Sequence, residues 1–351
     1  MIKYWTLVIG ISTICFSCQK QKDTNVLSDF EESSFLNVTD SIRLEEYGIL
    51  NPHYIYYKDS FLIFNSIQGE KELQFLDLET KHVHNRYVIG NGNNEMINYF
   101  TVQTPYTNCY KFADTQKGKI YGINLDSLRN DTNTCHKLSY SLPIQKGNHF
   151  FRFIETKDYV LGTGILQNGR IWVYNKHTSA SDEQQSYPDK KEINNMDYMY
   201  KGALFSRTLL SSNPQGSNLV TACFGLLDFY SIAENGKLTL QKERYYHFPL
   251  FEAMPDGGSS IVYKKEDIVG ITGLYSDEKY IYVLYSNKTI KEAGADAAYN
   301  ASHLLLFDWD GKPVIHYHLS KALYGFTICR DTLYGLSREK NPIVYCFTIT
   351  H

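Results

Sequence analysis

The sequence predicts an all-β protein, and the spacing of its strand-like segments indicates a six-bladed β-propeller. Strand-favouring aromatic residues are abundant, with 29 Tyr and 19 Phe against 5 Met. Short runs of alternating apolar residues, separated by turn residues, recur along the chain. They form successive units at irregular spacings of roughly 40 to 55 residues, in the range of propeller blades and solenoids. These units contain residues 59–89, 116–125, 159–175, 218–246, 278–320 and 331–350.

The first residues have the pattern of an export signal. Lys3 precedes an apolar run at residues 6–16, and Ser17 and Cys18 follow it. The run is shorter than the roughly 20 residues that a membrane-spanning helix needs. The end of this segment, Ser17 and Cys18, resembles the lipobox of bacterial lipoproteins, although Cys15 stands where Leu is usual. The alternative is an ordinary secretory signal that is cleaved without lipid attachment. We expect lipid attachment at Cys18, with residues 1–17 as signal peptide, 18–33 as polar tether and 34–351 as propeller.

The remaining cysteines give no strong sign of a disulfide framework. Five are left after Cys15 and Cys18, an odd number that cannot all pair. Cys223 and Cys346 lie within apolar strand-like runs, where a thiol usually behaves as a small buried hydrophobe. A disulfide between Cys109 and Cys135 is compatible with the sequence, which does not require it.

The two ends of the chain predict how the ring closes. The last unit, residues 324–350, contains three strand-like runs and ends one outer strand short of a four-stranded blade. Residues 34–47 alternate well and have no obvious partner nearby. We therefore expect this N-terminal strand to complete the last blade. A β-sandwich or jelly roll is the alternative fold, but the chain is long for either.

Residues 179–216 interrupt the repeat. Their polar first half reads as a loop between blades, with a short helix around residues 190–199. Their second half is expected to supply the innermost strand of the fourth blade.

Residues 304–319 combine two carboxylates, a tryptophan, a glycine and two histidines. Asp310 and Gly311 lie between two alternating runs, which is a strong hairpin signal. Related turns occur at residues 166–173 and 233–240, so we interpret the feature as a repeated outer hairpin. The oxygen ligands of a calcium loop do not follow Asp308 and Asp310, and a solvent-facing turn gives no reason for the raised pKa of a glycosidase acid.

Two histidine pairs share a strand face because of their i, i+2 spacing. They are His82 with His84, and His316 with His318. Such a pair could begin a metal site if a third ligand joined it. Since both pairs belong to the predicted outermost strands of their blades, we expect exposed edge-strand histidines and no metal site.

Catalytic and nucleotide-binding motifs are absent from the sequence. Gly90 and Gly92 are followed by Glu95 where a dinucleotide-binding turn needs its third glycine, and no helix pattern follows. The 35 basic and 38 acidic residues give no electrostatic case for nucleic acid. We therefore expect no catalytic residues, no cofactor and no nucleic-acid partner.

Four segments resemble the TolB-like six-bladed β-propeller lipoproteins of gut-type Gram-negative anaerobes. They are GNGNNE at 90–95, YKGALFS at 200–206, GLYSDEKYIYVLYSNK at 273–288 and LLLFDWDGKPV at 304–314. The resemblance covers nearly the whole mature chain, with Asn93 where a proline is common. It implies a propeller on the periplasmic or outer-membrane side, without catalytic residues to carry over. The polar, basic residues 19–22 favour a periplasm-facing anchor.

These observations predict a lipid-anchored, monomeric propeller that binds an envelope protein or a small ligand without turning it over. A rigid ring can place side chains of its inner strands around one channel mouth. From position in the repeat, the candidate ligand-binding residues are Tyr54, Arg152, Lys201 and Thr272. The alternative function is a lyase or hydrolase acting on a carbohydrate or lactone, with His, Arg or Glu groups converging in the channel. A structural spacer without a ligand is the third possibility.

Overall fold

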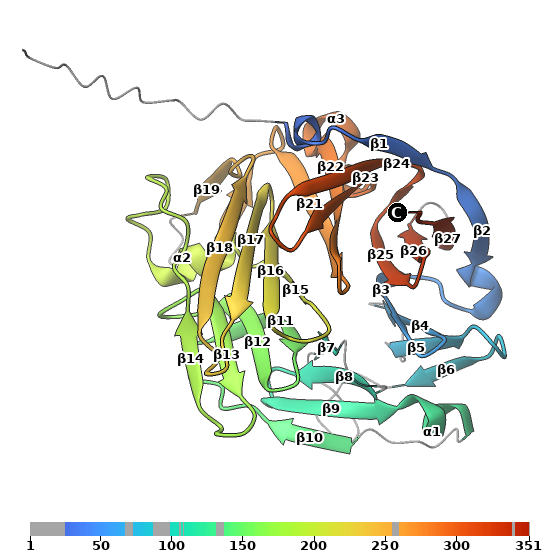
Figure 1. Cartoon of the computed structure of the whole chain (residues 1–351), viewed down its shortest axis with the longest axis horizontal. Helices are drawn as coiled ribbons and strands as arrows, with labels where there is room; N and C mark the ends of the chain where they lie inside the picture. Colours follow the sequence, from blue (N-terminus) through green and yellow to red (C-terminus); the bar gives the residue numbers. More distant parts are fainter. Residues whose placement is uncertain are drawn as a thin grey trace, which may run out of the picture.

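The computed structural model describes residues 25–66, 73–86, 99–104, 107, 109–130, 137–254, 260–338 and 341–350. In this part of the chain, antiparallel sheets are arranged around a central axis, as Figure 1 shows. Four short connections are α-helical and two are 3-10 helices: α1 (Leu125–Asn130), α2 (Tyr198–Leu204), α3 (Ile290–Ala293), α4 (Ala295–Ala298), η1 (Val26–Asp29) and η2 (Leu44–Tyr47). None of the described helices has the length and apolar character needed to cross a membrane.

Each blade begins with its innermost strand. Blade one contains β3 (Pro52–Lys58), β4 (Phe61–Ser66), β5 (Leu73–Asp77) and β6 (Val83–Arg86). Blade two contains β7 (Tyr99–Gln103), β8 (Cys109–Asp114), β9 (Lys119–Asn124) and β10 (Lys137–Ser141). Blade three contains β11 (His149–Glu155), β12 (Tyr159–Ile165), β13 (Ile171–Asn175) and β14 (Ser181–Gln184). The inner strands β7 and β11 pair in parallel, so blades two and three form one eight-stranded sheet.

The second half of the ring repeats this order. Blade four contains β15 (Leu209–Ser212), β16 (Asn218–Cys223), β17 (Leu226–Ile232) and β18 (Leu238–Tyr245). Blade five contains β21 (Ile268–Ser276), β22 (Tyr280–Thr289), β23 (Ala301–Asp308) and β24 (Pro313–Leu323). Blade six contains β25 (Gly325–Cys329), β26 (Thr332–Ser337) and β27 (Ile343–Thr348). A separate hairpin, β19 (Phe251–Ala253) with β20 (Ile261–Tyr263), follows blade four.

The N-terminal strand closes the ring as predicted. β2 (Val38–Arg43) pairs antiparallel with β27 and becomes the fourth strand of blade six. The strand before it was not expected: β1 (Ser33–Leu36) pairs in parallel with β24 and adds a fifth strand to blade five. Upstream of β1, the buried side chain of Val26 packs between blades four and five. Residues 26–33, which the sequence analysis assigned to the tether, thus contact the ring.

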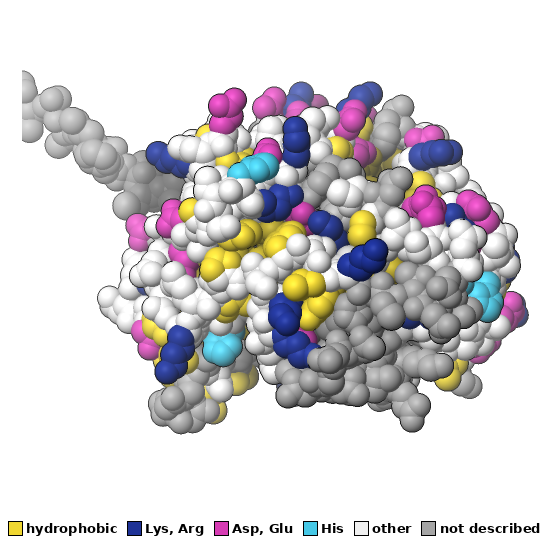
Figure 2. All heavy atoms as spheres, turned by 90° about the horizontal axis from the view of Figure 1, so that it is seen from below, with side chains coloured by type: hydrophobic (Ala, Val, Ile, Leu, Met, Phe, Trp, Pro, Cys, Tyr) yellow, Lys and Arg dark blue, Asp and Glu magenta, His cyan; other side chains and the backbone are white. Residues whose placement is uncertain are grey.

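Six apolar clusters of the described core lie one between each pair of neighbouring blades, and a seventh packs around α2 and the β19–β20 hairpin beside blade four. This arrangement follows from strand alternation, because side chains on both faces of each blade meet a neighbour. On the face shown in Figure 2, exposed basic and acidic side chains are interspersed, with apolar side chains between them.

The hairpin predicted at Asp310 and Gly311 is confirmed. Gly311 has φ of +72°, its amide donates to the Asp308 carbonyl, and the turn joins β23 to β24. Residues 233–240 form a related turn between β17 and β18, with φ of +81° at Gly236. Residues 166–173 differ, because they connect β12 to β13, the second and third strands of their blade.

β11 and β12 approach each other closely at Gly164. A Cβ placed on Gly164 would lie 1.9 Å from the carbonyl oxygen of His149, a backbone atom that cannot rotate away. We expect Gly164→Ala to lower the free energy of unfolding by about 1–3 kcal/mol, the usual cost of overpacking. Urea unfolding checks this. Gly325→Ala is the matched control on β25, because the nearest atom there, Ile55 Cγ2, lies 3.9 Å away. Equal stability of the two variants would contradict the prediction.

Candidate functional site

The ends of the six innermost strands converge on one mouth of the channel. Neighbouring inner strands contact one another around the ring, and Lys58 of β3 donates to the Thr104 carbonyl after β7 at 2.7 Å. The strand ends enclose a cavity of about 330 Å³. This is at the lower limit of the roughly 300–1,000 Å³ typical of ligand pockets.

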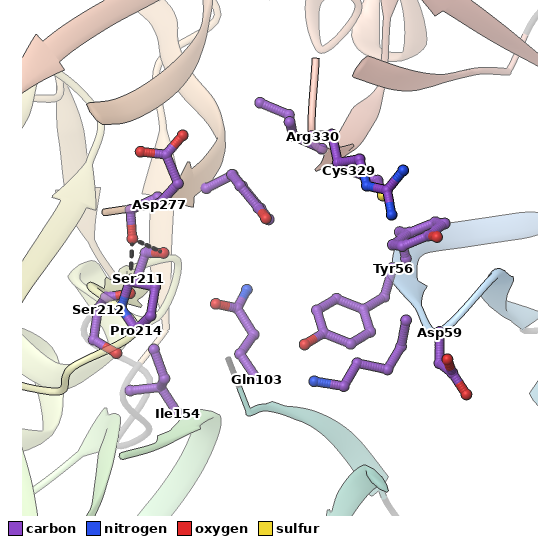
Figure 3. Close-up of a pocket in the computed structure, with 15 residues that line it drawn as sticks. Tyr56, Asp59, Gln103, Ile154, Ser211, Ser212, Pro214, Asp277, Cys329 and Arg330 are labelled. Atoms are coloured by element: carbon purple, nitrogen blue, oxygen red, sulfur yellow. Dashed lines mark hydrogen bonds between the residues drawn. The ribbon is translucent and has the colours of Figure 1, made fainter. Parts of the chain in front are cut away.

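The centre of the cavity is rich in hydrogen-bond donors. Figure 3 shows Gln103 and Tyr56 pointing toward the centre, whereas Asp59 and Asp277 lie at its margin. Burial raises the pKa of Tyr56, so its hydroxyl keeps its proton and can donate. The hydroxyl of Ser212, which is buried, has no hydrogen-bond partner among the described residues. Among these groups, the Ser212 hydroxyl is the one that no described residue satisfies, since Gln103 Nε2 donates to the Tyr54 hydroxyl at 3.5 Å.

The carboxylate of Asp277 is already used by its own turn. Its Oδ1 accepts from the amides of Lys279 and Tyr280 at 2.7 Å each, and its Oδ2 accepts from the Tyr282 hydroxyl at 2.8 Å. Such a carboxylate stabilises the β21–β22 connection. It is a poor candidate for a general base, because its lone pairs are engaged.

Serine hydroxyls join blades four and five at this mouth. The Oγ atoms of Ser211 and Ser276 lie 2.7 Å apart, and Ser276 Oγ lies 2.9 Å from the Ser212 carbonyl oxygen to which it donates (Figure 3). These contacts hold the ends of β15 and β21 in a fixed relation, which preorganises this side of the cavity.

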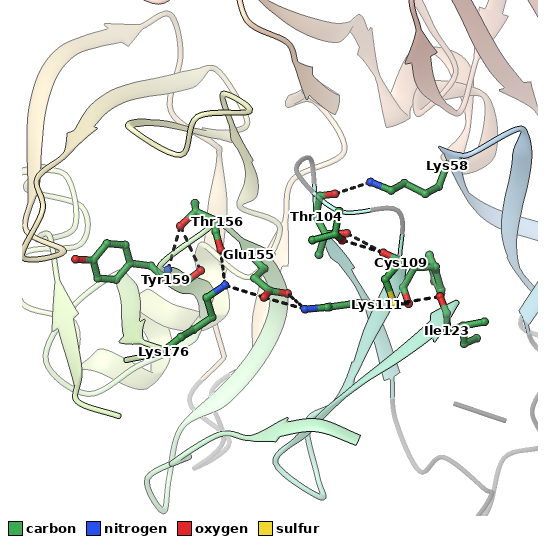
Figure 4. A network of polar contacts seen from close by, with 11 residues as sticks. Lys58, Thr104, Cys109, Lys111, Ile123, Glu155, Thr156, Tyr159 and Lys176 are labelled. Carbon is green, nitrogen blue, oxygen red and sulfur yellow. Dashed lines mark hydrogen bonds and ion pairs between the residues drawn. The ribbon is translucent and has the colours of Figure 1, made fainter. Parts of the chain in front are cut away.

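A buried carboxylate fixes blades two and three beside the cavity. Glu155, which is 1% exposed, follows the cavity residue Ile154 and pairs with Lys111 Nζ at 2.8 Å and Lys176 Nζ at 3.0 Å. Lys176 also donates to the Thr156 carbonyl at 2.7 Å. Figure 4 shows this network joining β8 to the end of β11. Its lysines are engaged with Glu155, so we interpret the network as support for the cavity wall.

Two of the four candidate residues come together in the channel. Tyr54 lies on β3 and Arg152 on β11, and the charge of Arg152 acts on the Tyr54 hydroxyl. Gln103 Nε2 lies 3.5 Å from the Tyr54 hydroxyl, which links this pair to the cavity. Both residues precede the ends of their strands, so they lie deeper in the channel than the cavity lining.

Arg152 has an unsatisfied donor. Its Nε has no hydrogen-bond partner within the described part of the chain. Burial lowers the pKa of its guanidinium, although an arginine remains charged at neutral pH. A buried cationic group with an unused donor can bind an anionic group strongly.

The other two candidates lie elsewhere. The expectation that Lys201 occupies an inner strand is wrong: it lies on α2, before β15, and its Nζ donates to the Asn194 carbonyl at 3.3 Å. The position of Lys201 in the repeat predicted an inner strand. However, the helix predicted around residues 190–199 forms later, at Tyr198–Leu204, and therefore contains Lys201. Thr272 does lie on the inner strand β21, but its hydroxyl donates to the Leu284 carbonyl at 3.4 Å and does not line the cavity.

Sequence reasoning missed Gln103, Tyr56 and Ser212. These three residues lie toward the ends of the innermost strands of their blades. Because the ends of all six inner strands meet at one mouth, this position in the repeat could have identified them. The glycine-rich residues 89–98, Cys18 and Cys135 lie outside the described residues. Cys109 is a free thiol whose Sγ donates to the Ile123 carbonyl at 3.1 Å, and Cys223 and Cys346 are buried as predicted.

The prediction of exposed edge-strand histidines is wrong for His316 and His84, which are both buried. β24 is not an edge strand, because β1 pairs along it and covers His316. His84 packs against the ring of Phe61 at 6.1 Å between centroids. His82 is exposed, as expected.

Fold and cavity together define a six-bladed β-propeller with a small, donor-rich cavity at one channel mouth. The sequence of residues 29–331 matches the TolB-like 6-blade propeller-like family, and the chain belongs to that family. A search of curated proteins gave no match.

Solved structures share the fold at low sequence identity. The "Putative exported protein" of Bacteroides fragilis NCTC 9343 has a TM-score of 0.51 and 12% identity over 94% of this chain and 98% of its own. BamB from Moraxella catarrhalis has a TM-score of 0.39 and 12% identity over 85% and 69%. Kuenenia stuttgartiensis hydrazine synthase has a TM-score of 0.44 and 14% identity over 81% and 73%. At these identities the similarity concerns the fold alone.

Proposed function

We propose that this protein is a lipid-anchored β-propeller of the cell envelope that binds an acceptor-rich, anionic group in its channel without catalysing a reaction. The observation that carries the proposal is the surplus of donors around the cavity. Tyr56, Gln103 and Ser212 face or line the cavity, and Arg152 lies deeper with an unused Nε–H. A carboxylate would satisfy several of these donors at once.

The lining favours binding over the alternative lyase or hydrolase. General acid–base chemistry needs a titratable group positioned at the reacting atoms. Among the described residues of the lining, the carboxylates are Asp59 and Asp277, which stand at the margin, and no histidine is present. Cys329 lines the cavity, but no histidine accompanies it there among the described residues. The arrangement therefore suits recognition by preorganised donors.

The anchor would attach beside the ring and away from the cavity mouth. η1 lies at the rim between blades four and five, where Val26 packs against both and Asp29 pairs with Arg244 of β18 at 3.1 Å. From Cys18 to Asn25 the chain can span at most about 25 Å when extended. Lipid attachment at Cys18 would thus hold the propeller close to the membrane, and residues 19–22 favour the periplasmic face. The B. fragilis protein of similar fold is described as exported, which agrees with this location.

Thermal melts with matched ligands test the binding proposal. We expect sodium glucuronate, citrate or acetate to raise the melting temperature saturably, and glucose to leave it unchanged, because glucose has hydroxyls but no carboxylate. At a ligand concentration of 100 times Kd, the stabilisation should be about 2.7 kcal/mol. Arg152→Met should abolish the shift while keeping the apolar part of the side chain.

The control variant is Lys279→Met. Lys279 is an exposed lysine in the turn that ends at the same mouth. The Lys279→Met variant loses one positive charge but keeps the cavity unchanged. Its ligand-induced rise in melting temperature should therefore equal that of the wild type. Indifference of the wild type to all three carboxylates, or an equal response of Arg152→Met and the wild type, would show that the channel donors do not recognise an anion.

A further inference from the structure

Three histidines that lie far from the channel are brought together on blade five. His303 of β23 is paired with His318 of β24, and His316 lies two residues before His318. The three side chains therefore share one face of the sheet. His303 Nδ1 lies 2.9 Å from His316 Nε2, and one ring nitrogen from each of the three histidines lies within 4.8 Å of the others.

The Asp310–Gly311 turn alone does not set the register that assembles this cluster. Phe307 pairs with Pro313 beside the turn, but the register then shifts at a β-bulge, and Leu306 pairs with Ile315. The shifted register places residue 303 opposite residue 318. The third ligand that the pair at 316 and 318 lacked thus comes from the preceding strand of the same hairpin.

The three imidazoles have the chemistry of a metal site. Burial, the first cause, lowers the pKa of His303 and of His316 to about 4, so both rings are neutral at pH 7 and have a free lone pair. Neutral imidazole nitrogens are preferred ligands of zinc at about 2.0–2.1 Å. Tetrahedral geometry then needs ring nitrogens about 3.3 Å apart, so small rotations of the rings suffice. No carboxylate or thiol is grouped with the three rings among the described residues, which leaves a fourth position for water.

The N-terminal segment covers the cluster. Phe35 of β1 stacks on the His318 ring with centroids 5.0 Å apart, and the Phe30 ring lies 6.2 Å from that of His316. The His316 amide donates to the Glu32 carbonyl at 3.0 Å. These contacts hold the His316 and His318 rings from the side opposite His303, although Phe35 itself is 74% exposed.

We propose that His303, His316 and His318 bind one divalent transition metal ion, with Zn²⁺ as the best fit. The hydrogen atom between His303 Nδ1 and His316 Nε2 moves to the other nitrogen of its ring when that nitrogen binds the metal. His303 and His316 release no net proton in this step, because both rings are already neutral. The ion ties β23 to β24 directly beneath the segment that leads to the N-terminal strand. Its role is structural: it strengthens the attachment of the N-terminal segment to the ring.

Metal titration of the full-length protein, without an added histidine tag, tests the proposal. We expect one Zn²⁺ per chain by calorimetry and by metal analysis after dialysis. Co²⁺ should give the visible absorption of a tetrahedral nitrogen-ligated ion. His318→Gln changes the least buried ring of the three. Because this variant loses a direct metal ligand, its affinity for Zn²⁺ should fall by about 100-fold or more. Residues that only hydrogen-bond to metal ligands already contribute about 10–100-fold.

The chain offers a matched control at His82 and His84. These histidines have the same i, i+2 spacing, but no third histidine, cysteine or carboxylate is grouped with them among the described residues. His82→Gln should bind Zn²⁺ and Co²⁺ as the wild type does. If His303→Gln or His316→Gln fails to fold, the His318→Gln variant and its Co²⁺ spectrum still test whether the three histidines bind the metal. Wild-type affinity or an unchanged Co²⁺ spectrum in His318→Gln would overturn the proposal, as would a stoichiometry of zero.

Discussion

Replacing Asp228 with alanine should lower the free energy of unfolding by about 3–5 kcal/mol, because it leaves the buried Arg170 without its counterion. The two side chains are 2% and 4% exposed, and Arg170 Nη2 is hydrogen-bonded to Asp228 Oδ2 across blades three and four. Arg170 Nη2 also donates to Thr221 Oγ1 at 2.8 Å. Urea unfolding at pH 7 measures the loss.

The matched control is the double variant Arg170→Met with Asp228→Leu. The pair is incompletely satisfied, since Arg170 Nε and Asp228 Oδ1 have no hydrogen-bond partner among the described residues. Replacing a buried pair by apolar residues of similar size is often neutral or stabilising. We therefore expect the double variant to unfold within about 1 kcal/mol of the wild type. A single variant as stable as the double one would show that the charge at Arg170 tolerates burial without Asp228.

Removal of residues up to Arg43 should have a comparable or larger effect, because it opens the ring. The truncated chain lacks β1 and β2, and with them the buried Leu36 and the ladder between Val38–Arg43 and β27. Loss of one buried leucine costs about 2–5 kcal/mol, and each hydrogen bond of the ladder adds about 0.5–1.5 kcal/mol. We expect a loss of more than about 5 kcal/mol in total.

The truncated chain should also self-associate, because β27 becomes an unpaired edge. Size-exclusion chromatography and thermal melts check both effects. A chain starting at Asn25 is the control, since it keeps every described residue, and its melting temperature should match that of the intact protein. Adding a peptide of residues 33–47 should raise the melting temperature of the truncated chain. A truncated chain that melts like the control would mean that ring closure contributes little to stability.

Neither structural experiment changes a residue of the cavity. Arg170 and Asp228 lie between blades, and residues up to Arg43 lie at the rim, so neither lines the cavity. The truncation does remove Phe30 and Phe35, which cover the three histidines. If the metal strengthens attachment of the N-terminal segment, Zn²⁺ should stabilise the chain starting at Asn25 more than the truncated one.

Local sequence patterns were enough to predict most strands, the hairpin turns and the closure of the ring. Alternation of apolar residues reports which face of a strand is buried, and Asp-Gly and Asn-Gly turns act over a few residues. Gly311 therefore formed its turn where predicted, and β2 filled the place that the incomplete last blade left open. Positions tied to strand order, such as Tyr54 and Arg152, were placed correctly on inner strands.

What covers each strand, and which side chains meet, depends instead on contacts between segments that are distant in the sequence. Exposure of a strand depends on pairing with segments far away in the sequence, as Phe35 and His318 illustrate. The parallel pairing of β1 with β24 turned a predicted exposed histidine into a buried one, and the packing of blade against blade joined Arg170 to Asp228. The cavity likewise exists because six strand ends meet at one mouth. Local periodicity carries no information about such contacts, since they depend on how whole blades are oriented.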